Sequence, residues 1–597
     1  MTSFAKAATA PQRGISGSLQ RGESAAKSLF FGEILEDNLF PYPQIPAADQ
    51  ETLSAICDAI DDFLQDKAAD FKRWDEAGEQ PADFIQSLRD MGLFGLIIPE
   101  QYGGLGLSNA GYARVLAQTS RYDSSVSLTI GAHSSIGMKG LLLFGNEAQK
   151  QRYLPKLASG ELIAAFCLTE SGSGSDAASI RTKATRNPDD SWSLDGEKIW
   201  ITNGGIAGFY TVFARTDTDA GKMTAFIVQA DDAGVSHGPH EDKMGIRSSN
   251  TCTVAFENVR VPADRVLGEV GKGFKVAMAI LNNGRTGLGG GAVGGMRKLI
   301  ELASAQAQER KQFGRAIAEF GMVRKKIAQM QIDCFAAESA VWMVAHYIDS
   351  GCEDYSTEAA ISKVFASEAI QRSGYEALQI AAGNGFMKEY PYEKITRDSR
   401  ILSIFEGTNE ILRLYIALSG LKDLGDSLKE MKSAVSEIFS NPIKGFGVLS
   451  GYASRRLSGA TGIGQDRISQ SLPEILKPAA LIYERYTNEM ATASDAVLRK
   501  YGKAIADQQY ALERIGNVTI DLFVGLCTLA RAAMLTATAD PNAEVANSIA
   551  QLFAKQAKRR MSRQLRQLSF NEDSATDALC STVLKNGKSC FDVLSLR

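Results

Sequence analysis

The sequence is poor in the residue types that bind metals or form disulfides. Its 597 residues include eight cysteines and four histidines. The cysteines are scattered, with no C-x-x-C pair, and a chain of this length needs no disulfide staples, so a reducing compartment is favoured. The one close histidine pair, His237 and His240, lacks Cys or carboxylate ligands at zinc-site spacing. The sequence therefore predicts neither a disulfide framework nor a metal centre.

Long apolar runs and a strong excess of charge are also absent. No uninterrupted apolar run approaches the roughly 18 residues of a membrane-spanning helix. The net charge of −4 creates no field that would recruit nucleic acid. With 44% hydrophobic residues and a prior of roughly 150 residues per domain, the chain is expected to be globular with about three or four domains.

The first 22 residues contain three basic residues, no acidic residue and many Ser and Ala. This composition suits a mitochondrial presequence and equally a disordered tail. The location therefore stays open between a mitochondrion and a bacterial cytoplasm, where the protein would be free or peripheral to the inner membrane.

Hydrophobic periodicity divides the chain into parts of different type. Helical spacing places Ile85, Leu88 and Met91 on one face, and strand-like alternation surrounds a turn expected at Asp195-Gly196. The predicted parts are a tail (1–48), a helical domain (49–163), a β domain (164–272), a helical bundle (273–422), a linker (423–478) and a further helical domain (479–597). Because strands and helices do not alternate, a doubly wound nucleotide-binding fold is disfavoured.

The glycine run "GGGAVG", Gly289 to Gly294, formally matches the dinucleotide fingerprint G-x-G-x-x-G. That fingerprint needs a preceding strand, whereas the residues before Gly289 have a helical pattern. We therefore expect these glycines to permit close helix packing or approach to a ligand.

The stretch "IFEGTNEI" places Glu406 between an aromatic residue and a glycine. Apolar surroundings disfavour the charged form and raise the pKa of a carboxyl towards the range of a general base. The alternative is a solvated Glu at a helix entrance, where negative charge near the helix N-terminus is mildly favourable.

Three further stretches have the composition of ligand-binding loops, although each alone is also compatible with a surface loop. "FCLTESGSGSDAAS" (166–179) combines glycines and hydroxyls that can present N–H groups to a ligand. "KIWITNG" (198–204) offers a flat Trp200 surface, and "QIAAGNGF" (379–386) adds a turn of small residues after a helix.

Together and in this order, these motifs resemble the acyl-CoA dehydrogenase family, and most closely its very-long-chain branch. The resemblance extends from about residue 38 to the C-terminus and is dense from Gly92 to Leu418, with "YGGLGL", "LPKLASGE", "WITNGG", "KMGIRSSNT", "ERKQFG" and "IFEGTNEILR". It implies an α+β, mainly α fold with an N-terminal helical domain, a middle β domain, a C-terminal helical bundle and an extra C-terminal helical domain. It also implies FAD bound at a subunit interface without a Rossmann fold.

The resemblance assigns cofactor roles to particular positions. Those expected at the flavin are Phe166, Leu168, Thr169, Ser175, Trp200 and Thr202. Those expected from the partner of a homodimer are Arg310, Phe313, Gln379 and Gly383, with Arg310 at the pyrophosphate. Those expected near phosphate at the start of a helix are Thr408, Asn409 and Glu410.

The resemblance also implies the reaction. Glu406 would take the α-proton of a long-chain fatty acyl-CoA, the β-carbon would deliver hydride to flavin N5, and a trans-2-enoyl-CoA would leave. The Glu406 N–H and a ribityl hydroxyl would polarise the thioester oxygen. Relatives with their base at the position of Gly284 differ, which argues against an isovaleryl-type enzyme. The positions expected at the substrate are Ser175, Asn282, Arg285, Phe405 and Gly407, with the small residues Ser127 and Gly131 leaving room for a long chain.

Electrons would pass to electron-transfer flavoprotein. Two alternatives remain: an acyl-CoA oxidase, which returns electrons to oxygen, and a respiratory-complex assembly scaffold with residual dehydrogenase activity. Ser171 and Ala382 depart from the Pro and Gly usual in the family, which puts local loop shape in doubt but no proton or hydride position.

Two C-terminal stretches have alternative interpretations. In residues 441–459, Phe446, Leu449, Ala453 and Leu457 fit a shallow interfacial helix for peripheral membrane contact, although glycines make a solvated linker equally compatible. The basic run from Lys555 to Arg566 is interpreted as a solvated helix face rather than a lipid or partner patch.

Overall fold

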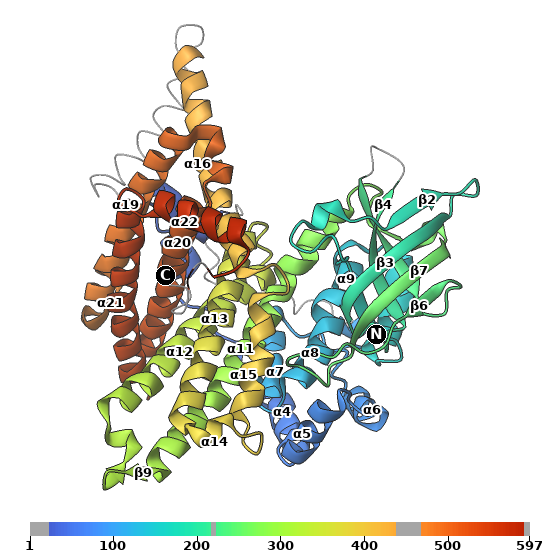
Figure 1. Cartoon of the computed structure of the whole chain (residues 1–597), viewed down its shortest axis with the longest axis horizontal. Coiled ribbons are helices and arrows are strands. Elements are labelled where there is room, and N and C mark those ends of the chain that lie inside the picture. The colour runs from blue at the N-terminus through green and yellow to red at the C-terminus, as the bar shows by residue number, and fades with distance from the viewer. Residues whose placement is uncertain (1–22, 217–221, 438–466, 590, 592–597) are drawn as a thin grey trace, which may run out of the picture. The chain divides into compact units, whose positions relative to one another are not determined.

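The computed structural model describes residues 23–216, 222–437, 467–589 and 591 (Figure 1). The chain forms two compact units. Of the described residues, the first unit contains 23–24, 35–412 and 526–550. The second contains 25–34, 413–437, 467–525, 551–589 and 591.

The first unit begins with helices, as predicted. Their bounds are α3 (Glu36–Leu39), α4 (Ala47–Leu64), α5 (Ala68–Ala77), α6 (Ala82–Asp90), α7 (Asn109–Ser120), α8 (Ser124–Gly131), the π-helical η3 (Ala132–Gly137), α9 (Lys139–Phe144) and α10 (Glu147–Ala158). Ser108 and Asp123 cap α7 and α8, because their side-chain oxygens accept N–H groups of the first turn. Ile85 and Leu88 of α6 are buried in the core.

The middle part is a sheet. Its described strands are β1 (Ala164–Cys167), β2 (Lys183–Arg186), β3 (Trp192–Thr202), β4 (Phe209–Thr216), β5 (Met223–Gln229), β6 (Val235–His237), β7 (Thr251–Val261) and β8 (Val266–Leu267). Their order is β6-β7-β3-β2-β4-β5-β8, and β1 pairs parallel with β4. The short helix η3 and the start of α11 pack against these strands.

The turn predicted at Asp195-Gly196 is wrong. Strand β3 continues through both residues, and its pairing with β7 shifts register between Leu194 and Gly196. Gly196 has φ +151°, and a Cβ there would overlap Thr182. The Asp-Gly pair therefore forms a β-bulge, a feature with the same preference for glycine as a turn.

The first unit continues with long helices that pack as a bundle. Its elements are α11 (Gly273–Glu309), β9 (Lys311–Gln312), β10 (Arg315–Ala316), α12 (Gly321–Asp349), α13 (Ser356–Ala381), α14 (Gly383–Phe386), α15 (Tyr392–Ser399) and the first turn of α16 (Asn409–Glu437). The predicted order of helical, β and helical parts is thus confirmed.

The glycine run lies inside α11 and serves helix packing. A Cβ at Gly290 or Gly294 would collide with the backbone of Ala113 or Ala117 of α7. A Cβ at Gly289 would collide with Val341 of α12. The residues directly before the run are helical and not a strand, so the packing interpretation is confirmed and the dinucleotide fingerprint is excluded.

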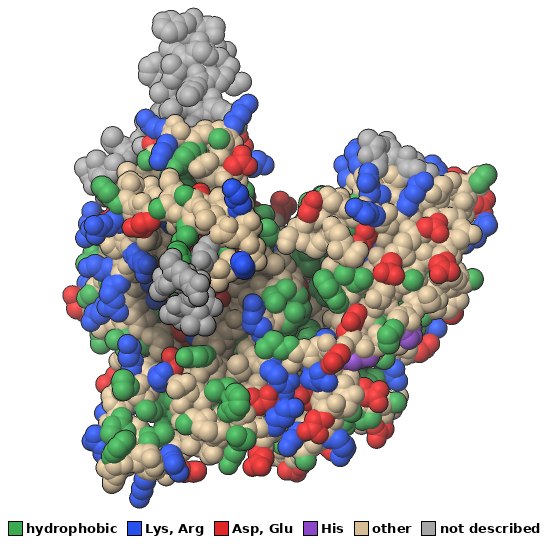
Figure 2. Space-filling model, in the orientation of Figure 1, with side chains coloured by type: hydrophobic (Ala, Val, Ile, Leu, Met, Phe, Trp, Pro, Cys, Tyr) green, Lys and Arg blue, Asp and Glu red, His purple; other side chains and the backbone are tan. Residues whose placement is uncertain are grey.

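The second unit is helical. Its elements are α2 (Ala25–Ser28), η1 (Leu29–Phe31), the rest of α16, α18 (Ile468–Ser471), α19 (Lys477–Tyr501), the first part of α20 (Gln509–Ala537), the second part of α21 (Ala543–Gln567) and α22 (Asp573–Asn586). Figure 2 shows Lys and Arg side chains gathered on the surface of this unit. Lys555, Lys558 and Arg563 of α21 are exposed. Arg560 of this run pairs with Asp521.

Two predicted boundaries are wrong. The tail does not extend to residue 48, because Leu29 and Phe30 are fully buried and Phe30 packs against Gly420 of α16. The linker does not begin at residue 423, because α16 continues to Glu437. Residues 526–550, which belong to the predicted C-terminal helical domain, pack within the first unit, where Arg531 pairs with Glu338. The interfacial helix considered at 441–459 lies outside the described residues.

Helix α20 is long and apolar enough to cross a membrane by length and composition alone. However, 83% of its most apolar window is buried inside the structure. Core helices commonly have both properties, so burial alone accounts for its composition.

Candidate active site

Glu406 lies in a strained loop between α15 and α16. Its φ is +53°, and that of Gly407 is +92°. A left-handed backbone costs a residue with a side chain about 1–2 kcal/mol. The N–H groups of Glu406 and Gly407 donate to no acceptor within the part of the chain that the structure describes. The loop therefore keeps two donors available beside the carboxyl group.

One oxygen of the Glu406 carboxyl is enclosed, and the residue as a whole is half-buried. Its Oε2 is shielded from solvent and accepts no hydrogen bond from the described residues. Burial raises the pKa of Glu406 to about 7, although nearby Arg285 and Lys363 act to lower it. A Cβ at Gly284 would lie 3.7 Å from Glu406 Oε1. The two base positions compared from the sequence thus lie next to each other in space.

Two buried cations hold the carbonyl groups of this loop. Arg285 of α11 is 5% exposed, and its Nη2 lies 3.5 Å from the Glu406 carbonyl. Its Nη1 donates to Asn282 Oδ1 at 2.6 Å. Lys363 of α13 is fully buried and donates to the Gly407 carbonyl at 2.7 Å. Sequence reasoning gave Lys363 no role, although a lone lysine within the apolar helical run "AAISKVFASEAI" is a detectable signal.

The predicted role of the Asn409 side chain as a phosphate donor is wrong. Asn409 is 2% exposed, and its Oδ1 accepts from Lys363 at 2.9 Å. Its Nδ2 donates to Ser367 Oγ and Glu368 Oε1. The amide is therefore committed to α13. Thr408 accepts the N–H of Ile411 at the start of α16, where Glu410 is exposed.

The residues expected along the acyl chain meet one face of α11. A Cβ at Gly287 would contact Tyr112 and Leu116 of α7, and a Cβ at Gly131 would lie 3.5 Å from Leu116 and 3.8 Å from the Tyr112 hydroxyl. A Cβ at Gly291 would lie 3.6 Å from Ser127 Oγ. Small residues thus follow one another from the Glu406 carboxyl towards α8.

The two loops expected at the flavin are joined. The Ile199 N–H donates to the Thr169 carbonyl at 3.0 Å, where β3 departs from regular pairing with β7. Trp200, at φ +58°, is 64% exposed. The other expected side chains differ in burial: Leu168 is buried, Phe166, Thr169 and Thr202 are half-buried, and Ser175 is exposed.

A buried ion pair lies beneath these loops. Lys198 Nζ is 2.6 Å from Glu170 Oε1 and 3.1 Å from the Leu168 carbonyl, and neither charged side chain is more than 7% exposed. Burial alone would raise the pKa of Glu170, but hydrogen bonds from Lys198, Thr182 and Arg181 hold that pKa below its usual value. Sequence reasoning quoted Lys198 within its motif but gave it no function.

The four residues expected from a partner subunit are all exposed in this chain. Phe313, in the β9–β10 hairpin, is 94% exposed, and Arg310, Gln379 and Gly383 are also exposed. Large apolar side chains nearby in sequence, among them Met322 and Phe386, are likewise exposed. A group of large apolar side chains exposed on one part of the surface is typical of a site that another protein covers.

Backbone strain concentrates in the predicted motifs. Nine described residues other than glycine have positive φ, and six of them belong to the motifs quoted above: Trp200, Asn203, Ile246, Phe313, Ala382 and Glu406. Such conformations persist where the surroundings impose them, and they cluster at active sites. The structure therefore supports the same set of loops as functional by an independent criterion.

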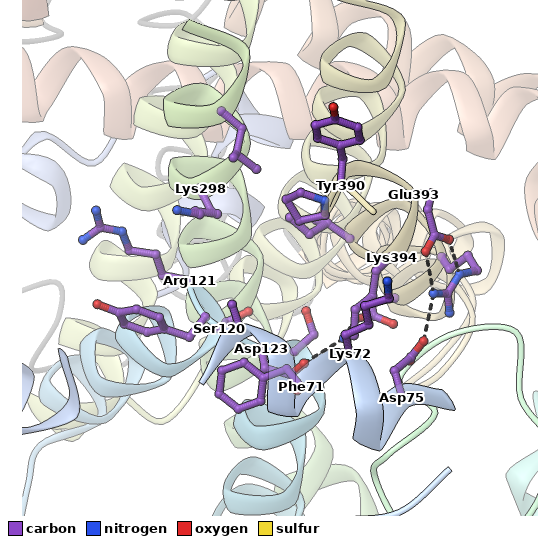
Figure 3. A pocket seen from close by; sticks show the side chains of 18 of the residues that line it. Phe71, Lys72, Asp75, Ser120, Arg121, Asp123, Lys298, Tyr390, Glu393 and Lys394 are labelled. Carbon is purple, nitrogen blue, oxygen red and sulfur yellow. Dashed lines mark hydrogen bonds and ion pairs between the residues drawn. The ribbon is translucent and has the colours of Figure 1, made fainter. Parts of the chain in front are cut away.

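A cavity of about 350 Å³ lies apart from these residues, between α5, α8, α11 and α15 (Figure 3). Ion pairs occupy much of its wall: Lys394 pairs with Asp123 and Asp398, and Arg397 pairs with Asp75. Because Asp123 also caps α8, this cluster fixes the helix that presents Ser127 and Gly131.

Family models match almost all of the described chain. The acyl-CoA dehydrogenase N-terminal domain matches residues 50–161, the middle domain 165–259 and the C-terminal domain 271–421. The ACAD9/ACADV C-terminal domain matches residues 474–588.

Individual proteins agree with these matches. The very long-chain specific acyl-CoA dehydrogenase, mitochondrial, of Homo sapiens is 43% identical over 87% of this chain and 80% of its own length. An acyl-CoA dehydrogenase of Bacillus anthracis complexed with FAD has a TM-score of 0.78 and 30% identity, covering 93% of this chain and 94% of its own. A chain from the structure of the electron transferring flavoprotein of Acidaminococcus fermentans has a TM-score of 0.60 and 34% identity, over 63% of this chain and 98% of its own. Since such matches extend over most of the sequence, this protein belongs to the acyl-CoA dehydrogenase family and is an FAD-dependent oxidoreductase.

Proposed function

We propose that this acyl-CoA dehydrogenase acts on long- and very-long-chain fatty acyl-CoA, and that Glu406 removes the α-proton while the β-hydrogen leaves as hydride. The product is the trans-2-enoyl-CoA. The observation that carries the proposal is the partly enclosed Glu406 carboxyl, whose pKa burial raises to about 7. A base with a pKa near the working pH combines a useful ionised fraction with sufficient basicity.

The α-proton of a thioester is too weakly acidic for a carboxylate unless the carbonyl oxygen is stabilised as negative charge develops. The N–H groups of Glu406 and Gly407 have no acceptor among the described residues. We assign the Glu406 N–H to the thioester oxygen. A single donor of this kind is worth about 10²–10³-fold in kcat.

The residues of the two joined loops fit a planar, aromatic group such as the isoalloxazine of FAD. Trp200 offers an exposed ring, and Thr169 and Thr202 of the same two loops carry half-buried hydroxyl side chains. A Cβ at Gly172 or Gly174 would meet nothing within 4 Å, so the loop backbone is open to approach. When bound, FAD supplies the acceptor for the hydride.

The protein is proposed to work as a homodimer in which each subunit completes the cofactor site of the other. Arg310, Phe313, Gln379 and Gly383 would act on the partner's side of the interface. Their exposure in this chain supports that assignment. Arg310 suits the pyrophosphate because guanidinium donates two parallel hydrogen bonds to oxyanions.

The preference for long chains rests on small residues. Gly131 and Ser127 are small, and a Cβ at Gly131 would already be in van der Waals contact with Leu116. Larger side chains at these positions would end the path of an alkyl chain. The similarity to the very long-chain specific enzyme of Homo sapiens supports the same preference.

Electron-transfer flavoprotein is the proposed acceptor of the electrons, and the similarity to a chain from the Acidaminococcus fermentans structure supports it. The test is anaerobic titration of the purified holoenzyme with butyryl-, octanoyl- and palmitoyl-CoA while flavin absorbance is followed. Bleaching strongest with palmitoyl-CoA is expected. Flavin that stays oxidised with all three thioesters would contradict the proposal, and peroxide formation in air would identify an oxidase instead.

A further inference from the structure

Lys363 of α13 anchors the loop that carries Glu406. Its side chain is fully buried in α13, and its Nζ donates to the Gly407 carbonyl and to Asn409 Oδ1. Burying an ammonium group is costly unless hydrogen-bond acceptors surround it. Lys363 has two such acceptors, so the fold compensates for its burial.

The contacts of Lys363 fix the part of the loop with left-handed backbone, Glu406 and Gly407. Peptide groups are planar and trans, so a held carbonyl also orients the N–H on the other side of the same peptide. Arg285 orients the peptide between Glu406 and Gly407, and Lys363 orients the next one. The two cations thus hold the consecutive left-handed residues from two different helices.

The Asn409 side chain extends this anchor. It accepts from Lys363, donates to Ser367 Oγ at 3.0 Å and to Glu368 Oε1 at 3.1 Å, and is 2% exposed. Ser367 follows Lys363 by one helical turn, so one face of α13 grips both the loop and the start of α16. The backbone on either side of residue 408 is therefore attached to one rigid element.

We infer that Lys363 is a positioning residue for proton abstraction: it holds the Gly407 carbonyl and Asn409, and so fixes the left-handed backbone that aims the Glu406 carboxyl. This inference rests on the proposed role of Glu406 as the base. It adds that the geometry of the base depends on a cation in α13 whose hydrogen bonds go to the Gly407 carbonyl and Asn409.

The charge of Lys363 acts in the same direction. The ionisable groups around Glu406 are Arg285 of α11, Lys363 of α13 and the Tyr112 hydroxyl of α7. Lys363 also faces Glu368 and Glu410. Burial lowers the pKa of Lys363 to about 7, and the Glu406 carboxylate raises it, so the two groups titrate as a pair. Whichever of the two groups holds the proton, removal of the Lys363 ammonium raises the pKa of Glu406.

The test compares the holoenzymes of Lys363→Met and Lys363→Arg with wild type. For Lys363→Met we expect kcat with palmitoyl-CoA to fall about 100-fold, as displacements near 1 Å do, with KM and flavin content little changed. The acidic limb of the kcat profile should move to higher pH, so that raising the pH restores part of the loss. Lys363→Arg keeps the cation, and its limb should stay at the wild-type pH.

Lys139→Met is a matched control, because Lys139 is also buried in the first unit but contacts Asn109 instead of the loop. Its kcat and pH profile should match wild type. The inference is overturned if kcat of Lys363→Met stays within about twofold of wild type. It is also overturned if the acidic limbs of the kcat profiles of Lys363→Met and Lys363→Arg move by the same amount. Should Lys363→Met not fold, an unmoved limb in Lys363→Gln would overturn it. Glu406→Gln, measured in parallel, separates the two claims: if it turns over normally, the proposed function itself fails.

Discussion

A bulky side chain at position 131 should convert the enzyme to a preference for shorter chains. Gly131 lies on α8, where its Cβ would be 3.5 Å from Leu116 and 3.8 Å from the Tyr112 hydroxyl. In Gly131→Phe the ring cannot remain at that position without filling the space between α7 and α11. The end of a long acyl chain would then be displaced, while the thioester end at Glu406 would be unaffected.

The distance along α11 sets where the effect begins. Gly284 lies beside Glu406, and Gly291 lies beside Ser127. The seven residues between them correspond to about 10 Å of helix. An extended alkyl chain advances about 1.25 Å per carbon when its bonds are near 1.5 Å, so it spans this distance with about eight carbons. Displacing four methylenes at about 0.8 kcal/mol each costs about 3 kcal/mol, or roughly 200-fold in kcat/KM.

The assay is kcat/KM for hexanoyl-, octanoyl-, dodecanoyl- and palmitoyl-CoA in wild type and Gly131→Phe. We expect the ratio of variant to wild type to fall steeply beyond octanoyl-CoA, while hexanoyl-CoA stays within about threefold. Gly131→Ala, which adds one methyl group at a distance the neighbours tolerate, serves as the control. Equal losses at every chain length would refute the assignment of Gly131 to the acyl path.

Three further outcomes follow from the structure. Because burial raises the pKa of Glu406 to about 7 and only the carboxylate accepts a proton, kcat/KM should rise about tenfold per pH unit below that value and level off above it; a profile flat from pH 5 to 8 would contradict this. Lys198→Met should lower the free energy of unfolding by about 3–5 kcal/mol and weaken FAD retention, because it leaves Glu170 buried without its cation. Adding Glu170→Gln should recover part of that loss in a urea titration, whereas an unimproved double variant would exclude the ion pair as the cause. Ala382→Gly should raise the free energy of unfolding by up to about 1 kcal/mol, because Ala382 has φ +53°; a destabilised variant would show that the alanine methyl has a packing role.

The sequence predicted what local periodicity and motif order encode. The order of helical, β and helical parts could be read from apolar spacing, since each face that packs must repeat with the period of its element. The helical character of Gly289 to Gly294 was also predictable, because the residues before the run already had a helical pattern. The motif around Glu406 pointed to a base before any geometry was known.

The wrong predictions concern residues whose conformation or burial depends on tertiary contacts. The Asp195-Gly196 pair suits a turn and a bulge equally, and only pairing with β7 decides between them. Phe30 lies in a segment with no periodicity of its own, and its burial depends on Gly420, far away in sequence. The Asn409 side chain was assigned to phosphate because it begins a helix, but the buried Lys363, 46 residues earlier, captures it.

The central claim is that the Glu406 carboxylate takes the α-proton, and the rate of flavin bleaching tests it most directly. Glu406→Gln keeps the shape of the side chain and removes its basicity, so FAD content and palmitoyl-CoA binding should stay as in wild type. On rapid anaerobic mixing with palmitoyl-CoA, we predict bleaching slower by about 10²–10⁴-fold. Bleaching at the wild-type rate would contradict the account.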